Sequence, residues 1–420
     1  MSAKGLILAA PTSGSGKTTV TLGLLRALSR RGEAVRGAKS GPDYIDPRFH
    51  EAACGQPSLN LDAWAMPKHQ IRALANGEGL LLIEGAMGLF DGAPPDGDGA
   101  TADLARILGL PVVLVVNAGS MSHSVAALVR GFAGHDPEVR VSGVILNNVG
   151  SPRHEAMLRR ALAPLGLPVL GALRRDPSLA LPDRHLGLVQ AAEHPDLSGF
   201  LDRAADAVAE QIDLDALTAL ARETATAPAR PPKHAPKRIA IARDAAFSFA
   251  YPHQLAAWAR AGCTILPFSP LADEAVPEAE FIFLPGGYPE LHAGTLAANT
   301  IFLGSLREAA KTSDIYGECG GYMVLGETLT DAEGTPHRMA GLLGLSTSFA
   351  KRKLHLGYRR LNSHWPALPG PHMAHEFHYA TTLAAEGTPL FDAWDAEDTA
   401  LAPMGLIEGR VAGSFAHIIA

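Results

Sequence analysis

A short apolar run near the start of the chain passes directly into a loop of small residues and then into Gly-Lys-Thr. Residues 6–19 read Leu-Ile-Leu-Ala-Ala-Pro-Thr-Ser-Gly-Ser-Gly-Lys-Thr-Thr. This order predicts a buried strand, a phosphate-binding loop and the first turn of a helix, because loop N–H groups and a helix N-terminus can surround phosphate oxygens. Lys17 would reach the β- and γ-phosphates, and the Thr18 hydroxyl would bind Mg²⁺.

The same loop gives a set of expected ATP contacts. Pro11 stands where the standard loop has its first glycine, so the match is not complete. An ordinary glycine-rich turn between a strand and a helix is the structural alternative. The residues expected to contact ATP are Ser13, Gly14, Ser15, Gly16, Lys17, Thr18 and Thr19.

The first half of the chain alternates fully apolar runs with stretches of helical period. Strands that are apolar on both faces and separated by helices indicate a parallel sheet covered on both sides. The predicted fold of this half is therefore a doubly wound, mostly parallel α/β domain that ends in a long helix near 199–222. Apolar runs lie near 5–10, 80–84, 112–116, 143–147 and 168–172, and helical stretches lie at 17–31, 101–109, 122–133 and 153–163.

A change of composition near the middle divides the chain. With 420 residues it is too long for a single core, so two domains are expected. Residues 224–237 hold four prolines and no large apolar side chain, which predicts an extended linker between domains at 1–223 and 238–420. In the second domain we expect strands near 238–243, 263–267, 280–284 and 314–318, helices near 252–261 and 296–311, and more β-structure beyond 340.

Charge and cysteine content exclude several classes of protein. The 36 basic and 43 acidic residues leave a net charge of −7, without a block of like charge, so nucleic acid and anionic membranes are poor partners. Three widely spaced cysteines exclude a disulfide scaffold, and we expect Cys54 and Cys263 to be packing residues. No apolar run is long enough to span a membrane. The expectation is a cytoplasmic protein, with a homodimer as the commonest assembly.

Acidic residues support the predicted phosphate site. Glu84 ends the apolar run at 80–84, where a carboxylate can meet the metal ion of a bound nucleotide. Asp43 and Asp46 lie on a turn-rich loop and could complete a Mg²⁺ site or contact substrate; turn chemistry and helix capping are the alternative. Asn147 ends another apolar run and is placed to bind a base edge, although a strand-end turn explains it nearly as well.

A second candidate site surrounds the third cysteine. Residues 314–323 read Asp-Ile-Tyr-Gly-Glu-Cys-Gly-Gly-Tyr-Met, a predicted strand that meets a helix through a sharp turn. The turn would present Cys319 at a helix N-terminus, where the helix field lowers the pKa of a thiol. Backbone N–H groups of Gly287 and Gly320 could form an oxyanion hole. His417 is the candidate general base for this nucleophile.

The histidine-rich stretch His375–Tyr379 invites a metal interpretation, which the spacing does not support. The metalloprotease signature places two histidines four residues apart on a helix, whereas His375 and His378 are three apart in a β-rich stretch. We expect a buried polar cluster or substrate contacts here.

Eight segments, in order across both halves, resemble the cobyrinic acid and hydrogenobyrinic acid a,c-diamide synthase family. They are Ala10–Thr19, Gly41–Pro47, Glu84–Gly92, Gly119–Val125, Pro182–Leu188, Pro285–Glu290, Gly317–Tyr322 and His375–Tyr379. The resemblance implies an ATP-dependent amidotransferase. Its first domain would be similar to dethiobiotin synthetase, and its second to class I glutamine amidotransferases, with Cys319 as nucleophile and His417 as base.

The resemblance also implies substrates and their contacts. The first domain would bind Mg-ATP and a corrinoid acid and phosphorylate the a and c acetate carboxylates, and L-glutamine would supply ammonia to it from the second domain. By position, Thr18, Asp46 and Glu84 match the metal site. The substrate contacts would be Asp43, Tyr44, Ile45 and Asp91.

Two positions depart from the family pattern. Many class I amidotransferases have His-x-Glu, but Ile419 stands two residues beyond His417, so another group would have to orient that base. Asn117 stands where relatives often have aspartate. Three alternatives stay open: a cobyric acid synthase, a partitioning-type ATPase switch and a glutaminase subunit for another enzyme. The sequence does not say whether the corrin substrate carries cobalt.

Overall fold

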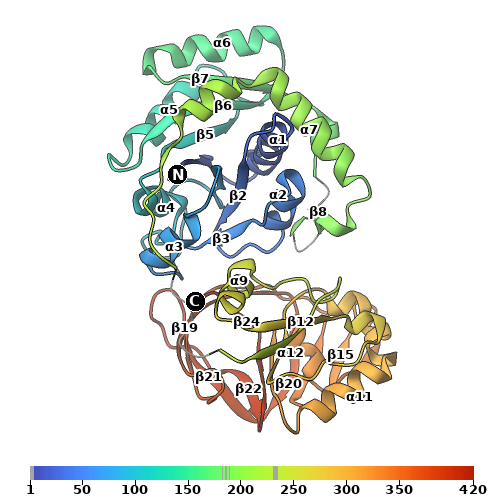
Figure 1. Cartoon of the computed structure of the whole chain (residues 1–420). Coiled ribbons are helices and arrows are strands. Elements are labelled where there is room, and N and C mark those ends of the chain that lie inside the picture. Colours follow the sequence, from blue (N-terminus) through green and yellow to red (C-terminus); the bar gives the residue numbers. More distant parts are fainter. Residues whose placement is uncertain (1–3, 182, 185–186, 189, 230–234) are drawn as a thin grey trace. The chain divides into compact units, whose positions relative to one another are not determined.

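The computed structural model describes residues 4–181, 183–184, 187–188, 190–229 and 235–420. The chain forms two compact units, Met1–Arg230 and Pro231–Ala420 (Figure 1). The dividing point falls within the proline-rich stretch 224–237, of which residues 230–234 lie outside the described part. The segment Pro182–Leu188, one of the eight that carry the family resemblance, is likewise described only in part.

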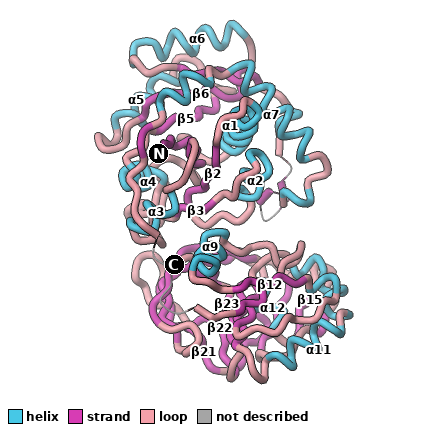
Figure 2. The backbone as a smooth tube through the Cα atoms, viewed as in Figure 1, coloured by secondary structure: helices cyan, strands magenta, loops and turns pink. Residues whose placement is uncertain are grey.

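The first unit is a parallel sheet enclosed by helices, the α/β architecture predicted for it (Figure 2). Seven parallel strands follow the order β3-β2-β4-β1-β5-β6-β7, and β10 (Arg222–Glu223) adds antiparallel to the start of β1. Because β1 lies between β4 and β5, the sheet is wound in both directions from its centre, and the loops that leave the carboxyl ends of these three strands meet at one edge. The strands are β1 Lys4–Ala9, β2 Val35–Ser40, β3 Leu59–Leu61, β4 Leu80–Glu84, β5 Val112–Asn117, β6 Val141–Val149 and β7 Val169–Arg174.

The helices of this unit bury one apolar side each. In α1 the side chains of Val20, Leu24 and Leu28 are fully buried, whereas Arg30 is exposed, the pattern of a helix that packs on a sheet. Helices α1, α2 and α7 pack together, and α5 packs with α6. The helices are α1 Lys17–Arg30, α2 Asp46–Cys54, α3 Lys68–Ala75, α4 Thr101–Leu108, α5 Val125–Gly134, α6 Pro152–Leu162, α7 Leu197–Gln211 and α8 Leu214–Leu220.

Two expectations for this unit were wrong in detail. The long helix near 199–222 is two helices, α7 and α8, because Ile212 is extended and Asp213 caps α8 by accepting the Ala216 N–H at 2.9 Å. The turn-rich loop expected to carry both Asp43 and Asp46 ends sooner than predicted, because Asp46 begins α2.

The second unit is built on a mixed sheet. Its ten strands follow the order β12-β11-β13-β14-β23-β22-β21-β18-β19-β24, of which the first five are parallel. The strands are β11 Arg238–Ala242, β12 Thr264–Phe268, β13 Phe281–Leu284, β14 Asp314–Glu318, β18 His355–Ser363, β19 Gly370–His378, β21 Thr388–Trp394, β22 Met404–Glu408, β23 Val411–Ser414 and β24 Ala416–Ile418.

The last two strands make this sheet curl. Strands β23 and β24 follow each other in the chain with Phe415 between them, yet β23 pairs with β14 and β24 pairs with β19 at the far end of the order. The sheet must therefore bend round until β24 returns beside β23. That return carries His417 to the end of β14, where Cys319 follows.

A smaller sheet and four helices complete the second unit. The sheet has the order β16-β15-β17-β20. The helix expected at 296–311 is interrupted at Asn299, whose amide donates to the carbonyl of Pro270 at 2.7 Å. The remaining elements are β15 Thr328–Thr330, β16 Pro336–Arg338, β17 Gly344–Ser348, β20 Thr381–Glu386, α9 Pro252–Arg260, α10 Ala293–Ala298, α11 Thr300–Ala309 and α12 Gly320–Leu325.

Across the described part of the chain, every helix falls short of the length and apolarity that crossing a bilayer requires.

The contact between α1 and α7 depends on a glycine. A Cβ added to Gly23 would lie 2.6 Å from Val208 Cγ2 and 2.7 Å from the carbonyl oxygen of Ala204. We expect Gly23→Ala to push the helices apart and lower the free energy of unfolding by about 1–3 kcal/mol. Gly131→Ala in α5 is the matched control, since a methyl group there meets nothing within 4 Å. Denaturant unfolding should show that control unchanged or more stable; equal effects from both would contradict the packing argument.

Candidate active sites

The phosphate-binding loop has positive φ angles at two of its glycines. Gly14 and Gly16 have φ values of 74° and 83°, a region that favours glycine. Asn147, at the end of β6, donates its amide to the carbonyl of Ser15 at 3.0 Å, and a Cβ on Gly16 would lie 2.1 Å from the same amide nitrogen. Asn147 therefore holds the loop backbone, and its contact with a base stays a prediction.

Lys17 and Thr18 both reach toward the end of β4. The Lys17 ammonium donates to the carbonyl of Met87 at 2.6 Å, and the Thr18 hydroxyl donates to Glu84 Oε1 at 2.6 Å. Burial lowers the pKa of Lys17 to about 8, although the nearby negative charge of Glu84 acts to raise it. A phosphate group beside this ammonium would favour its charged form.

A buried lysine joins the two acidic residues predicted at this site. Lys39, at the end of β2, donates to Asp46 and, at 2.8 Å, to Glu84 Oε1. Burial alone would lower the pKa of Lys39, but the carboxylates of Asp46 and Glu84 outweigh it and raise that pKa. Glu84 also accepts from His50 Nε2 at 2.7 Å. Lys39 and His50 are therefore members of this site that the sequence motifs did not predict.

The two carboxylates are not equivalent. Burial opposes ionisation of Glu84, but Lys39 and His50 lower its pKa well below the ordinary range. Burial and the neighbouring Asp43 raise the pKa of Asp46 to about 8, against the effect of Lys39. Glu84 therefore carries the negative charge of the site, and a cation that replaces Lys39 between the two oxygens would ionise both.

The remaining predicted residues lie around this centre in different ways. Asp43 accepts the N–H groups of Ile45 and Asp46 at 2.7 and 3.0 Å in the turn before α2, which fits the turn-chemistry alternative. Tyr44 follows it and is half-buried. Asp91 accepts from Gly88 N at 3.0 Å, and a Cβ on Gly88 would touch both Asp91 and the carbonyl of Pro11, so Asp91 lies beside the phosphate loop.

Other predicted positions have local partners or are open to solvent. Thr19 donates to the carbonyl of Leu179 at 3.3 Å, and Ser15 donates to the carbonyl of Thr12 at 2.8 Å. Ser13 is exposed. Asn117 accepts from Gly119 N at 3.1 Å in an exposed turn.

Cys319 sits in the sharp turn expected between a strand and a helix. Its φ of 47° and ψ of −101° are unusual for a side chain with a Cβ, so the turn is strained. The Cys319 N–H donates to the carbonyl of Ser414 at 2.8 Å, which ties the turn to β23. Strand β14 and helix α12 thus hold the thiol in one place, as a nucleophile requires.

His417 and Cys319 meet at Gly286. A Cβ on Gly286 would lie 3.3 Å from Cys319 Cβ, 3.1 Å from His417 Nε2 and 2.3 Å from His417 Cε1. Glycine is therefore required there for the imidazole to approach the thiol. The two residues predicted as nucleophile and base are brought together in the described structure.

The two glycines predicted for the oxyanion hole are also neighbours. A Cβ on Gly320 would lie 3.1 Å from the Gly287 nitrogen, so the two backbones run close together beside the thiol. Gly287 itself is pressed against the carbonyl of Ala246, where a Cβ would come within 2.1 Å. Two N–H groups in this position suit an oxygen that gains negative charge.

The expectation of a thiol with a lowered pKa was wrong. Cys319 is only 4% exposed, and burial, with the nearby Glu290, raises the pKa of its thiol. The helix that follows, Gly320–Leu325, is too short to offset this. The thiol is therefore protonated near neutral pH and needs a base to become a nucleophile.

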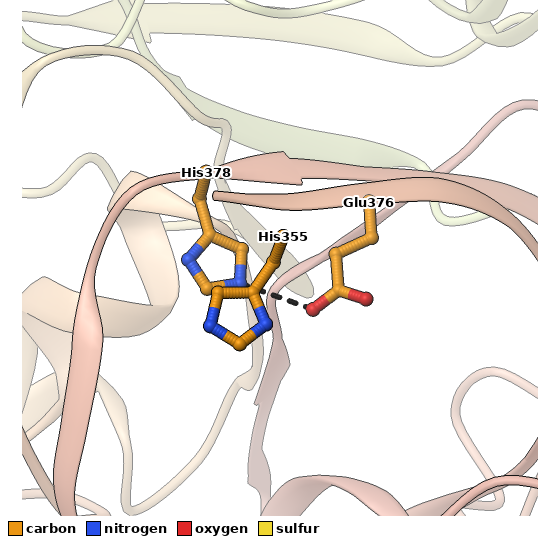
Figure 3. A group of neighbouring side chains, drawn as sticks. All are labelled: His355, Glu376 and His378. Carbon is orange, nitrogen blue, oxygen red and sulfur yellow. Dashed lines mark hydrogen bonds and ion pairs between the residues drawn. The ribbon is translucent and has the colours of Figure 1, made fainter. Parts of the chain in front are cut away.

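Glu376 and His378 of the histidine-rich stretch are buried and form a polar cluster with the half-buried His355. His355 from β18 and Glu376 and His378 from β19 offer ligand atoms within 4.8 Å of one another (Figure 3). Arg359 occupies one carboxylate oxygen of Glu376 at 2.7 Å, and the rings of His355 and His378 stack at 4.6 Å with an interplanar angle of 3°. Because the His355 and His378 rings are parallel, their nitrogen lone pairs lie in separate planes and do not point at one position. Arg359 balances the negative charge of Glu376.

Comparison with known proteins identifies a nucleotide-binding domain and a glutamine amidotransferase domain. Residues 6–189 match the CobQ/CobB/MinD/ParA nucleotide binding domain, and residues 238–420 match the CobB/CobQ-like glutamine amidotransferase domain. Three similar curated proteins are hydrogenobyrinate a,c-diamide synthases. The one from Rhodobacter capsulatus is 55% identical, covering 99% of both chains. The one from Brucella abortus is 56% identical, covering 99% of this chain and 98% of its own. The one from Mesorhizobium japonicum is 52% identical, covering 100% and 99%.

The fold and the two sites thus define a two-domain protein class that joins a nucleotide-binding domain to a glutamine amidotransferase domain. Full-length similarity then gives the family. The chain belongs to the hydrogenobyrinate a,c-diamide synthase family.

The charge of Glu290 should control the reactivity of Cys319. Burial raises the pKa of Glu290 to about 7, so this carboxyl group is mostly ionised at pH 8 and disfavours the thiolate. We expect Glu290→Gln to increase the rate of Cys319 alkylation by iodoacetamide at pH 8, on the order of fivefold. Below pH 6, where Glu290 is protonated, the two proteins should react at the same rate.

Mass spectrometry of the Cys319 peptide measures that rate. Glu386→Gln, on the exposed edge of β20, is the matched control and should alkylate like the parent protein. Equal rates for Glu290→Gln and the parent at pH 8 would contradict the electrostatic argument.

Proposed function

We propose that this protein is an ATP-dependent, glutamine-hydrolysing a,c-diamide synthase that converts the a and c acetate carboxylates of hydrogenobyrinic acid into amides. The observation that supports it best is that one chain holds both a phosphate loop joined to a buried acidic centre and a paired cysteine and histidine. The proteins that match it over its whole length carry the name of this activity.

The first unit supplies the activation step. A carboxylate reacts poorly with ammonia because oxide or hydroxide would have to leave, and transfer of a phosphoryl group from ATP provides a better leaving group. The phosphate loop and Lys17 would hold the phosphates of ATP. Asp43, Tyr44, Ile45 and Asp91 would contact the acid substrate, on the loops around the same sheet edge.

The acidic centre fits a magnesium ion. Lys39 contacts both Asp46 and Glu84, and the Thr18 hydroxyl contacts Glu84, so these three side chains offer oxygen ligands of the kind that Mg²⁺ prefers. Thr18, Asp46 and Glu84 would hold the ion, which when bound neutralises phosphate charge. Lys39 keeps the two carboxylates together in the structure described, and His50 fixes the orientation of Glu84.

The second unit supplies ammonia from glutamine. His417 takes the proton of the Cys319 thiol, and the sulfur attacks the side-chain carboxamide carbon of glutamine. The N–H groups of Gly287 and Gly320 would stabilise the oxyanion. The proton returns to the leaving nitrogen and ammonia departs, which leaves a thioester. Water then hydrolyses the thioester to glutamate and restores the thiol.

The setting of the reaction follows from its chemistry. Neutral ammonia is scarce near pH 7, so a dedicated source inside one protein is useful. ATP and glutamine are cytoplasmic metabolites, and we expect the enzyme to act there, with a homodimer as the expected assembly.

Replacement of the nucleophile should separate the two half-reactions. In Cys319→Ala, glutamine-driven amidation should vanish, because no thioester can form, while high ammonium should still support ATP-dependent amidation. Glutamate release, ADP formation and product mass, with metal-free and cobalt-bearing acids side by side, measure the outcome. Cys54→Ala and Cys263→Ala are matched controls on half-buried cysteines and should behave like the parent. Loss of activity with both nitrogen sources in Cys319→Ala would contradict this division of labour.

Replacement of the buried carboxylate Glu84 should impair the ATP-dependent half-reaction and leave glutamine hydrolysis intact. Glu84→Gln removes the charge that Thr18, Lys39 and His50 all face, so ATP-dependent ADP formation should fall on the order of 100-fold. Glutamate release from glutamine alone should persist. Glu78→Gln, an exposed residue of the same unit, is the control. Unchanged ADP formation in Glu84→Gln would exclude Glu84 from the nucleotide site.

A further inference from the structure

The base of the second site lacks an orienting carboxylate two residues further along the chain, where many class I glutamine amidotransferases have one. Two residues beyond His417 is Ile419, an apolar side chain that is 4% exposed. Its backbone carbonyl accepts from His253 Nε2 at 3.0 Å. Neither its side chain nor this contact can fix which nitrogen of His417 carries the proton.

A carboxylate from another strand reaches the imidazole instead. Glu318 ends β14, directly before the nucleophile, and its Oε2 lies 3.5 Å from His417 Nδ1. Its Oε1 accepts the N–H of Ile418 at 3.0 Å. We propose, on the basis of the function proposed above, that Glu318 is the positioning residue that holds His417 with its proton on Nδ1.

The strained turn at Cys319 explains how two consecutive residues serve one imidazole. Glu318 lies beside Nδ1 of His417. Cys319 lies on the Nε2 side of the ring, because a Cβ added to Gly286 would be close to both His417 Nε2 and Cys319 Cβ. The positive φ of Cys319 turns the chain between them. The ring is thus placed between a carboxylate and a thiol that are adjacent in the sequence.

The electrostatics of the pair favour this role. The side chains of Glu318 and His417 are 2% and 1% exposed, and a buried carboxylate requires polar partners. A carboxylate at Nδ1 selects the tautomer whose Nε2 is free to accept the thiol proton, and it stabilises the imidazolium that results. A contact of 3.5 Å can shorten when that charge appears.

The other titratable groups around His417 leave this role to Glu318. His375 lies opposite His417 in the β19–β24 register, and burial, with His417 itself, lowers the pKa of His375 to about 3. It therefore stays neutral and does not compete as a cation for the carboxylate. Glu290 and Glu376 raise the pKa of the Cys319 thiol, and Glu318 contributes to the same effect.

The test replaces Glu318 by glutamine. The amide oxygen can still accept from Ile418, but the amide N–H₂ then faces Nδ1 and favours the unproductive tautomer. We expect kcat for glutamate release to fall on the order of 10⁴-fold, the loss seen when the orienting carboxylate of a catalytic triad becomes an amide. KM for glutamine should stay within about threefold, and ammonium-supported amidation should be unchanged.

Two further variants separate positioning from structure. Asp331→Asn is the matched control, because Asp331 pairs with His337 at 2.7 Å in the same unit but outside the site, and it should keep its kcat. In a His417→Ala background, Glu318→Gln should cost nothing more, since a residue that acts through His417 has no effect once His417 is gone. Glu318→Asp should recover part of kcat. Full kcat in Glu318→Gln, or a further loss in the double variant, would overturn the proposal.

A measurement on the unaltered protein keeps the proposal testable if Glu318→Gln does not fold. Nitrogen-15 NMR of labelled protein should find the His417 proton on Nδ1, and a proton on Nε2 would overturn the proposal. Glutamate release does not depend on which acid is amidated. If the enzyme amidates a different acid, the proposed function is wrong but the role of Glu318 still stands. If the unaltered protein releases no glutamate from glutamine, both the proposed function and the role of Glu318 are contradicted.

Discussion

Glu84 is the buried carboxylate on which the first unit depends. It has no exposed surface and accepts from Thr18 on α1, Lys39 on β2 and His50 on α2. An ionised carboxylate in a protein interior costs several kcal/mol unless it is paired and hydrogen-bonded, so these contacts must form together for the unit to fold. Because each donor comes from a different element, one charge fixes the edge of the sheet where nucleotide chemistry would occur.

The second unit uses a buried carboxylate in the same place, at the carboxyl end of a central parallel strand. Glu318 ends β14 as Glu84 ends β4, and each precedes the loop or turn that carries the chemistry. Burial also disfavours the charged forms of the two reactive groups, since it lowers the pKa of Lys17 to about 8 and raises that of Cys319. Each group thus depends on a partner, a phosphate for Lys17 and His417 for Cys319, to take the form that the reaction needs.

The features that sequence could predict are those contained in one short segment. The phosphate loop, Glu84 and the Cys319 turn each combine a strand with its following residues, and the structure has them as expected in position. Lys39 and Glu318 were missed because their roles depend on Glu84 and His417, which are 45 and 99 residues away in the sequence. The break before α8 was different: Asp213, a good helix-capping residue, was present in the sequence and was overlooked.

The curl of the second sheet explains how a carboxylate from a different strand can orient His417. Residues two apart on a strand face the same side, so a His-x-Glu sequence places a carboxylate beside its histidine within one strand. Here β24 returns beside β14, and the Ile418 N–H bonds to Glu318 across the two segments. Once the strands meet at this point, a carboxylate from β14 reaches His417 Nδ1, and β24 does not have to supply a carboxylate of its own. The chemistry fixes where the charge must lie around the imidazole, and the fold decides which strand supplies it.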